Sequence, residues 1–398
     1  MLEPQSRLPL QEALHPPYGY VLDHAIGTTF SLDLMTMLTL PLSFTFSSGA
    51  REDGRFDSLL LLEGIRRFAG RITVFCQAGQ IAVPAQDQLL YGYLESSVVE
   101  VLPRSGLGVF HPKVWALRYL PDENAEPDDP VRYRLLVLSR NLTFDRSWDT
   151  MLVLDGVLSE RKNAIGRLHP LGNFFAALPQ LALRPVNESI ARKVDTIQYE
   201  LRRTEFDLPS PFTEIDYFPL GLKRGKSWPF ADWKSALLVV SPFLRQGFLD
   251  RIGQDCHNKT LISRLENLSE IDPAHLRTYK SIYVLSPNAD PEEETGEENI
   301  DKKLEDEIGL SGLHAKFFIE EQGWHANLWT GSANATNAAF HHNIEPESVT
   351  GTKKAIRHIY DIMHAFDCLP PEMGVEIAYL RYNYGLTITF SNHPTGAR

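Results

Sequence analysis

Two copies of a histidine–any residue–lysine step are the residues of this chain best suited to chemistry. The first copy holds His111 and Lys113, and the second holds His314 and Lys316. Residues i and i+2 of a strand face the same side, so each histidine and its lysine can point at one spot. An imidazole beside a fixed ammonium group is suited to attack on a phosphate. Two such units would supply one histidine to attack and one to protonate the leaving group.

A polar turn follows each step, with a serine and an asparagine two positions apart. Ser139 and Asn141 follow the first step, and Ser332 and Asn334 follow the second. The segment 312–345 resembles the phospholipase D superfamily, whose signature is H-x-K followed by G-S-x-N. The first half is similar to its tyrosyl-DNA phosphodiesterase members. The Asn-x-Glu sequence that ends at Glu345 is similar to that of bacterial nuclease members.

The resemblance implies a phosphodiesterase that needs neither metal nor cofactor. In that family one histidine forms a phosphohistidine, and the other protonates the departing oxygen and then activates water. We expect His111 to be the nucleophile and His314 the general acid. The lysines and asparagines of both motifs would hold the nonbridging oxygens and offset their charge, which assigns that role to Lys113, Asn141, Lys316 and Asn334.

Two acids and three further polar residues complete the expected site. Asp149 and Glu345 each begin the strand after a serine–asparagine turn, so each could hydrogen-bond the histidine of the opposite half. Ser139, Ser332 and Arg140 are the expected phosphate-binding groups. The chain departs from the family at Arg118, where many members have aspartate, and at the corresponding Glu321. Pro112 lacks an N–H group, which predicts an edge or a bulge at the first motif.

Other interpretations of these residues remain open. The chain could be an inactive relative that keeps the motifs for stability, and the asparagines could serve only as turn formers. His341 and His342 suggest a metal site, but no cysteine or acid has ligand spacing around them.

The predicted strands and helices run in the same order in both halves, which indicates a duplication. We expect an α/β fold of two mixed sheets flanked by helices, with the site between the halves. In the first half we expect strands at 20–31, 71–77, 97–102, 109–119, 133–139 and 148–154, with helices at 32–40 and 187–203. In the second half we expect strands at 235–242, 260–263, 281–285, 313–320, 325–331 and 345–350, with a helix at 243–252.

The halves are predicted to divide within 204–229, where prolines and a basic run interrupt the periodicity. This gives one repeat over 1–205 and another over 206–398. The spacer between motif and turn is longer in the first half, and its surplus, 120–130, is predicted to be a surface hairpin loop. Beyond the second repeat's motifs, a helix is expected at 355–366 and a strand or hairpin at 378–390.

Composition limits the partners and the compartment. With 398 residues, 43% hydrophobic and 23% charged, the chain is typical of a globular protein. Three isolated cysteines favour a reducing compartment, and no signal peptide or membrane span is predicted. We therefore expect a cytoplasmic protein. The net charge of −12 argues against non-specific coating of nucleic acid, although much of it lies in an acidic run at 290–307.

Three classes of function compete on this evidence. The favoured one is a nuclease or DNA-end phosphodiesterase, with DNA preferred to RNA as its partner. The second is a phospholipase or phospholipid synthase, against which stands the absence of a basic amphipathic helix for stable membrane association. The third is a subunit that depends on an ATPase or helicase partner, for example in bacterial restriction or phage defence.

Overall fold

The computed structural model describes most of the chain, in segments that include both motifs. The described residues are 10–44, 58–83, 89–94, 96–103, 108–126, 128–144, 147–209, 212–222, 228–285, 312–323, 325–341, 345–353 and 377–380. The acidic run 290–307 and the expected C-terminal elements lie outside these residues, apart from the strand Ile377–Leu380.

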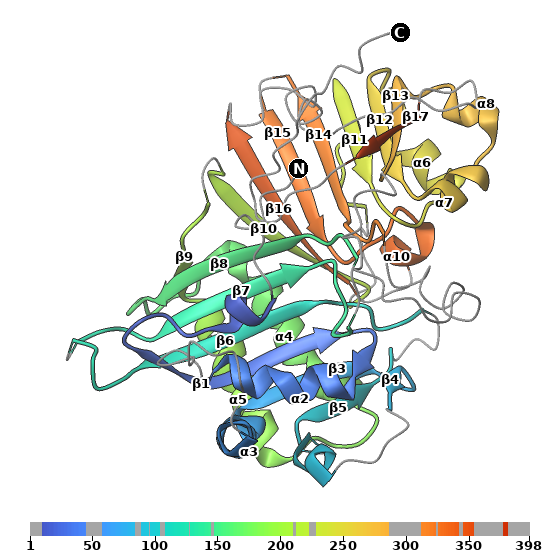
Figure 1. The fold of residues 1–398 in the computed structure, drawn as a ribbon. Helices are drawn as coiled ribbons and strands as arrows, with labels where there is room; N and C mark the ends of the chain where they lie inside the picture. Colours follow the sequence, from blue (N-terminus) through green and yellow to red (C-terminus); the bar gives the residue numbers. More distant parts are fainter. Residues whose placement is uncertain are drawn as a thin grey trace, which may run out of the picture.

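The first half is built on a seven-stranded mixed sheet in the order β5-β3-β1-β6-β7-β8-β9 (Figure 1). β1, β3 and β5 are parallel, and β6 to β9 join them as antiparallel strands. All six residues of β3 are buried, as expected for a strand covered on both faces. The strands are β1 (Tyr20–Thr29), β3 (Ile72–Gln77), β5 (Val98–Val101), β6 (Val114–Pro121), β7 (Arg132–Leu138), β8 (Met151–Leu158) and β9 (Thr204–Phe206).

The second half repeats this arrangement in an eight-stranded sheet of order β10-β16-β15-β14-β11-β12-β13-β17. Its run β13-β12-β11-β14-β15-β16 matches β5-β3-β1-β6-β7-β8 strand for strand. A short pair, β2 (Leu32–Asp33) and β4 (Ile81–Ala82), stands apart from both sheets. The second-half strands are β10 (Glu214–Leu220), β11 (Ala236–Val240), β12 (Lys259–Ser263), β13 (Ser281–Leu285), β14 (Phe317–Gln322), β15 (His325–Gly331), β16 (Glu345–Lys353) and β17 (Ile377–Leu380).

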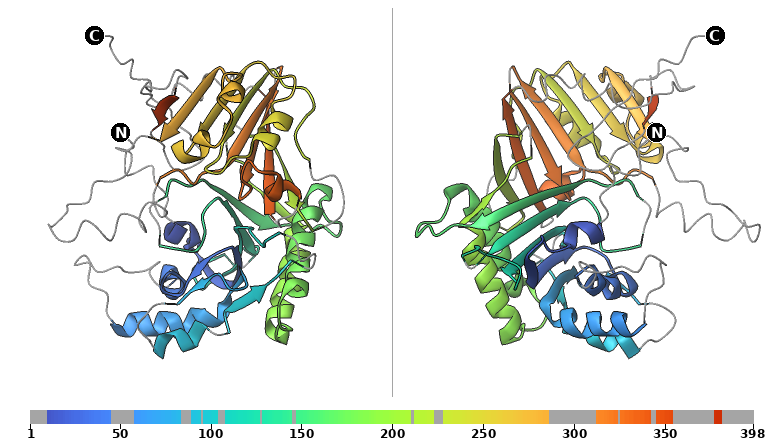
Figure 2. Two further views of the ribbon diagram at one scale, coloured as in Figure 1. Left: turned by 90° about the vertical axis from the view of Figure 1, so that its right-hand side faces the viewer. Right: turned by 60° about the vertical axis from the view of Figure 1, so that its left-hand side comes forward.

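Helices cover both faces of the first sheet (Figure 2). On one face, α4 (His169–Leu181) and α5 (Glu188–Leu201) bury a hydrophobic stripe against β6 to β8, and Asn187 caps α5 through its side chain. On the other face lie α1 (Leu10–Leu14), α2 (Leu34–Ser43) and α3 (Ser58–Phe68). The 3-10 helices of this half are Ala69–Arg71, Leu89–Leu94 and Gly166–Leu168.

The second half has its own core of aromatic side chains. Phe230 packs against Phe248, Phe318 and Trp329, with ring centroids 5.1 to 6.2 Å apart. The helices of this half are α6 (Gln246–Ile252), α7 (Leu265–Ser269), α8 (Pro273–Leu276) and α10 (Asn337–His341).

The expected fold class is confirmed: two mixed sheets flanked by helices, in matching strand order. Two expectations were wrong in detail. The segment 204–229, expected to be irregular, contains β9 of the first sheet and β10 of the second, because Ile215 and Tyr217 pack into the first-half core. The histidine–lysine steps do not lie within strands: β6 begins at Val114 and β14 at Phe317, so both steps are lead-ins to strands.

Candidate active site between the two halves

The first histidine–lysine step is held in an extended lead-in by bonds to neighbouring strands. The N–H of Phe110 donates to Oε1 of Gln77 (2.7 Å), and the N–H of Leu138 donates to the carbonyl of Lys113 (2.9 Å). Pro112 has no N–H, so a regular ladder cannot form there. An extended backbone still keeps His111 and Lys113 on one side, as the sequence predicted.

The second histidine–lysine step is held in place by backbone hydrogen bonds to the first half of the chain. The N–H of His314 donates to the carbonyl of Trp148 (2.9 Å), and the N–H of Trp148 donates to the carbonyl of Gly312 (2.8 Å). This parallel bridge between Trp148 and Leu313 joins the two halves at the site. In addition, Nε of Arg264 donates to the carbonyl of Leu313 (2.7 Å). The second motif is therefore positioned partly by the first repeat.

A carboxylate of the first half contacts the histidine of the second. Oδ1 of Asp149 lies 2.7 Å from Nδ1 of His314 and accepts a 2.7 Å hydrogen bond from Oγ of Ser139. Asp149 and Ser139 are both buried. Because Nδ1 is taken by the carboxylate, Nε2 is the nitrogen of His314 left to exchange a proton with a substrate. The prediction that Asp149 contacts the opposite histidine agrees with this geometry.

Both lysines are buried and point to their own histidine's backbone. Nζ of Lys113 lies 3.0 Å from Nε2 of His111 and 3.0 Å from its carbonyl oxygen. Nζ of Lys316 lies 2.6 Å from the carbonyl of His314 and 3.5 Å from that of Ser139. Since an ammonium group only donates, Nε2 of His111 accepts the bond from Lys113 and therefore carries a lone pair.

The electrostatics of the two histidines differ. Burial, then Lys113 and Lys316, hold the pKa of His111 well below its usual range, and a hydrogen bond to the backbone of Ser332 opposes this only in part. Burial and Lys316 also lower the pKa of His314, but there the Asp149 carboxylate counteracts the shift. Side chains from both halves therefore act on each histidine. Both pKa values are lowered, but only that of His314 is opposed by a carboxylate, so the neutral form is favoured more strongly at His111.

Asp149 stays ionised although it is buried. Burial raises the pKa of its carboxyl group, but His314, Lys316 and the Ser139 hydroxyl lower it more, so the net shift is downward. A buried carboxylate of this kind stabilises the imidazolium form of the histidine that it contacts.

The two serine–asparagine turns are held alike in both halves. The N–H of Leu142 donates to Oγ1 of Thr29 (3.0 Å), and the N–H of Ala335 donates to Oγ of Ser241 (3.0 Å). Thr29 is the last residue of β1, and Ser241 directly follows β11, the matching strand of the second half. The side-chain amides of Asn141 and Asn334 are only partly exposed, and Oδ1 of each is buried without a hydrogen-bond partner in the described part of the chain.

The sequence motifs did not predict the roles of Thr29 and Ser241, because both residues lie far from the motifs in the sequence. Comparing the two repeats would have found them. Each hydroxyl residue stands at the end of a strand, three positions before a leucine, which is Leu32 in the first half and Leu244 in the second. Those leucines form matching bridges to the turns, Leu32 to Leu142 and Leu244 to Ala335.

Three other predicted site residues, Ser332, Arg140 and Glu345, are placed as follows. Ser332 is fully buried, and Nη2 of Arg140 donates to the carbonyl of Thr143 (2.9 Å). Glu345 begins β16, and the register places it as Asp149 is placed: Gly331 pairs with Glu347, as Leu138 pairs with Met151. The side chain of Glu345 lies outside the described residues, as do residues 342–344.

Among the described residues, no group of three or more histidine, cysteine, aspartate or glutamate side chains could hold a metal ion. The two charged residues that depart from the family pattern, Arg118 and Glu321, form hydrogen bonds with residues outside the motifs. Arg118 bonds Asp23 and Glu200, each at 2.7 Å, and the backbone of Glu321 accepts from Ser235. Of the described helices, none is both long and apolar enough to span a membrane.

Comparisons with known proteins give similar folds at low identity. No protein-family model matches the sequence, and no curated protein matches it. A variant of yeast tyrosyl-DNA phosphodiesterase 1 aligns with 86% of this chain and 85% of its own, at 10% identity and a TM-score of 0.44. Phosphatidylserine synthase of Haemophilus influenzae aligns with 87% of this chain and 79% of its own, at 12% identity and a TM-score of 0.39. Polyphosphate kinase of Porphyromonas gingivalis aligns with 89% of this chain and 43% of its own, at 12% identity and 0.40.

Proposed function

We propose that this chain is a phospholipase D-like phosphodiesterase with one site built by both repeats. The observation that carries the proposal is the pairing of His314 with the buried Asp149 of the other half, together with His111 and two buried lysines; burial and the lysines hold the pKa of His111 well below its usual range. Displacement at phosphorus needs an unprotonated imidazole as nucleophile, a protonated imidazole as general acid, and fixed cations.

In the first step, Nε2 of His111 attacks phosphorus and the bond to the leaving oxygen breaks. Nε2–H of His314 gives its proton to that oxygen. For this attack Lys113 must first turn from the imidazole to a nonbridging oxygen, which frees the lone pair of Nε2 and offsets the charge that grows on that oxygen. Lys316, Asn141 and Asn334 are assigned to the other nonbridging contacts.

In the second step, water replaces the histidine. His314, now neutral, takes a proton from water as the oxygen attacks phosphorus. The bond from phosphorus to nitrogen breaks, and His111 leaves as a neutral imidazole. No metal enters either step. Glu345 is proposed to support His111 as Asp149 supports His314, from its matching register position.

We propose nucleic acid as the substrate, with DNA preferred to RNA. The motif resemblance supports this, and so does Arg140 beside the first turn. The exposed Arg66 of α3 pairs with Glu63 and is not assigned a role at the site. A role in restriction or phage defence beside an ATPase or helicase partner, in the cytoplasm, remains part of the proposal. A phospholipid substrate is the alternative.

The test is cleavage of labelled single- and double-stranded DNA and RNA in excess EDTA, by wild type and by the variants His111→Ala and His314→Ala. We expect cleavage that survives EDTA and is lost in both variants. His275→Ala serves as a control, because His275 pairs with Asp250 at α6 rather than with a motif residue. Cleavage that EDTA abolishes, or that survives in either variant, would overturn the mechanism. Activity on phosphatidyl lipids alone would mean that the substrate is a phospholipid and not a nucleic acid.

A further inference from the structure

Two long side chains at matching positions hold the residues that precede the motif histidines. Gln77 ends β3, and Arg264 directly follows β12, the matching strand of the second half. Oε1 of Gln77 accepts from the N–H of Phe110 (2.7 Å), whereas Nε of Arg264 donates to the carbonyl of Leu313 (2.7 Å). The same place in both repeats therefore anchors the motif, through a different side chain in each half.

The anchor of the second half acts directly on the peptide bond that precedes His314. The carbonyl of that bond belongs to Leu313 and accepts from Arg264, and its N–H donates to the carbonyl of Trp148 (2.9 Å). Because both groups of the peptide bond are paired, its plane cannot turn without the loss of a hydrogen bond. Arg264 therefore helps to fix the backbone from which the imidazole of His314 projects.

Arg264 also links the second motif to the second serine–asparagine turn. Its guanidinium group lies over the ring of Phe243, with Cζ 5.7 Å from the ring centroid. The carbonyl of Phe243 accepts from Oγ of Ser241 (2.8 Å), and the same Oγ accepts from the N–H of Ala335 (3.0 Å). One set of contacts thus joins the peptide bond before the histidine to the turn that carries the asparagine.

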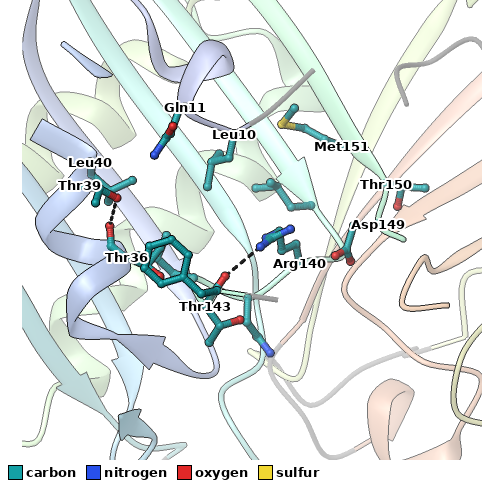
Figure 3. A pocket seen from close by; sticks show the side chains of 14 residues that line it. Leu10, Gln11, Thr36, Thr39, Leu40, Arg140, Thr143, Asp149, Thr150 and Met151 are labelled. Carbon is teal, nitrogen blue, oxygen red and sulfur yellow. Dashed lines mark hydrogen bonds between the residues drawn. The ribbon is translucent and has the colours of Figure 1, made fainter. Parts of the chain in front are cut away.

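The carboxylate that supports His314 borders an open space. Asp149 holds Nδ1 of His314 and also lines a cavity of about 310 Å³. Figure 3 shows Asp149 across this cavity from Leu40 of α2, and the described lining includes no motif histidine or lysine. A side chain that borders a void lacks packing partners on that side. The backbone anchor is therefore a second constraint on the imidazole, independent of the carboxylate.

We infer, given the proposed function, that Arg264 is a positioning residue for the general acid His314 and Gln77 is one for the nucleophile His111. In the first step a bond forms between phosphorus and Nε2 of His111. The bond to the leaving oxygen breaks, and that oxygen keeps the electron pair and takes the proton from Nε2 of His314. Displacement of His314 would impair the delivery of the proton, whereas displacement of His111 would impair attack on any diester.

The test compares kcat/KM for bis(4-nitrophenyl) phosphate and for diphenyl phosphate. 4-Nitrophenolate leaves without a proton, whereas phenolate is a stronger base and depends more on the general acid. General acid catalysis contributes about 10²–10⁴-fold, so Arg264→Met should lower kcat/KM by at least about thirtyfold for diphenyl phosphate and by less than about threefold for the nitrophenyl diester. Gln77→Met should lower both values by factors within about twofold of each other. Arg264→Lys keeps a donor on a long side chain and should recover most of the loss.

The control is Arg245→Met, because Arg245 lies two residues after Phe243 and its side chain pairs with the exposed Glu270 (2.7 Å). This variant should leave the ratio of the two kcat/KM values unchanged. Equal losses on both diesters in Arg264→Met, or no loss, would overturn the assignment and leave the proposed function intact. The same holds if Gln77→Met loses activity on diphenyl phosphate alone.

If Gln77→Met does not fold, the Arg264 variants decide the assignment by themselves. If the wild type hydrolyses neither diester, the assignment falls, and cleavage of labelled nucleic acid decides the proposed function separately.

Discussion

The two motif histidines have the same sequence context but different partners. His314 contacts the carboxylate of Asp149, whereas His111 lies beside Lys113 and within the influence of Lys316. Phe30 also packs on the His111 ring, with centroids 5.2 Å apart. At the scale of single residues, the Asp149 carboxylate opposes deprotonation of His314, whereas no described carboxylate does so at His111. This difference therefore supports His111 as the nucleophile.

The pKa directions predict an acidic optimum for kcat/KM. His111 must be neutral and His314 protonated, so activity rises as His111 loses its proton and falls as His314 loses its own. Both pKa values are lowered, that of His111 further, so the window between them lies below about pH 6.5. The measurement is a pH–rate profile with bis(4-nitrophenyl) phosphate.

Replacing Asp149 separates the two limbs of that profile. In Asp149→Asn the imidazolium of His314 loses its carboxylate, so the descending limb should move to lower pH, and kcat at neutral pH should fall by about a hundredfold or more. Asp155→Asn is the matched control, because Asp155 pairs with Arg134 on β7 and β8. An unshifted descending limb would show that Asp149 does not hold the proton on His314.

At the scale of elements, the hydroxyls at the ends of β1 and β11 position the turns that carry the asparagines. Thr29 and Ser241 each accept from the backbone N–H one residue after the asparagine. Each also donates to a carbonyl two residues on, that of Ser31 or Phe243. The repeat of this arrangement in both halves indicates a functional constraint on the turn.

Removing one of these hydroxyls should shift the asparagine of the turn while the asparagine itself stays unsubstituted. Thr29→Val leaves the buried N–H of Leu142 unpaired, which should cost about 1–3 kcal/mol of the free energy of unfolding. We expect kcat to fall more than tenfold with KM changed less, and Thr29→Ser to restore it. Paired kinetics and urea unfolding check this. A stability loss with normal kcat would confine Thr29 to a structural role.

Arg118 ties three elements of the first half together. It bonds Asp23 of β1 and Glu200 of α5 from its place on β6, and Tyr133 donates to the same Glu200 (2.6 Å). His24 and, against the effect of burial, Arg118 lower the pKa of Asp23 to about 2. Arg118 thus serves the fold of the first half by linking β1, β6 and α5.

Arg118→Met should destabilise the protein by about 3 kcal/mol, because it removes the cation of the largely buried Glu200 and one of the two partners of the partly exposed Asp23. The specific activity of the folded fraction should stay unchanged. Chemical unfolding and assays below the transition would measure both. Arg66→Met, which breaks only an exposed pair with Glu63, should leave the melting temperature unaltered. A loss of kcat in folded Arg118→Met would place this residue in the catalytic machinery.

At the scale of the whole molecule, each half completes the other. The bridge between Trp148 and Leu313, and the contact of Asp149 with His314, cross from one repeat to the other. A single chain therefore contains every group of the proposed site.

This arrangement predicts that inactive variants do not rescue each other. Equal amounts of His111→Ala and His314→Ala should remain inactive when mixed, since every chain lacks one histidine of its own site. Cleavage assays before and after the two variants are mixed, and after joint refolding, provide the measurement. Recovery of about a quarter to a half of wild-type activity would instead mean that the halves exchange between chains.

The sequence by itself determined the duplication, the fold class and the paired motifs. Strand patterns and motif spacing are local properties, and they recur in both halves. The sequence also proposed the contact of Asp149 with the histidine of the opposite half. Only the tertiary structure showed that Thr29 and Ser241 hold the turns, that Leu313 bridges to Trp148, and that a cavity adjoins the first turn. Those contacts join residues far apart in the chain, and their distances depend on how the two sheets pack. The strand starts at Val114 and Phe317 were misjudged for a related reason. The backbone there stays extended, but its hydrogen bonds go to side chains, loops and the opposite half rather than to a sheet ladder.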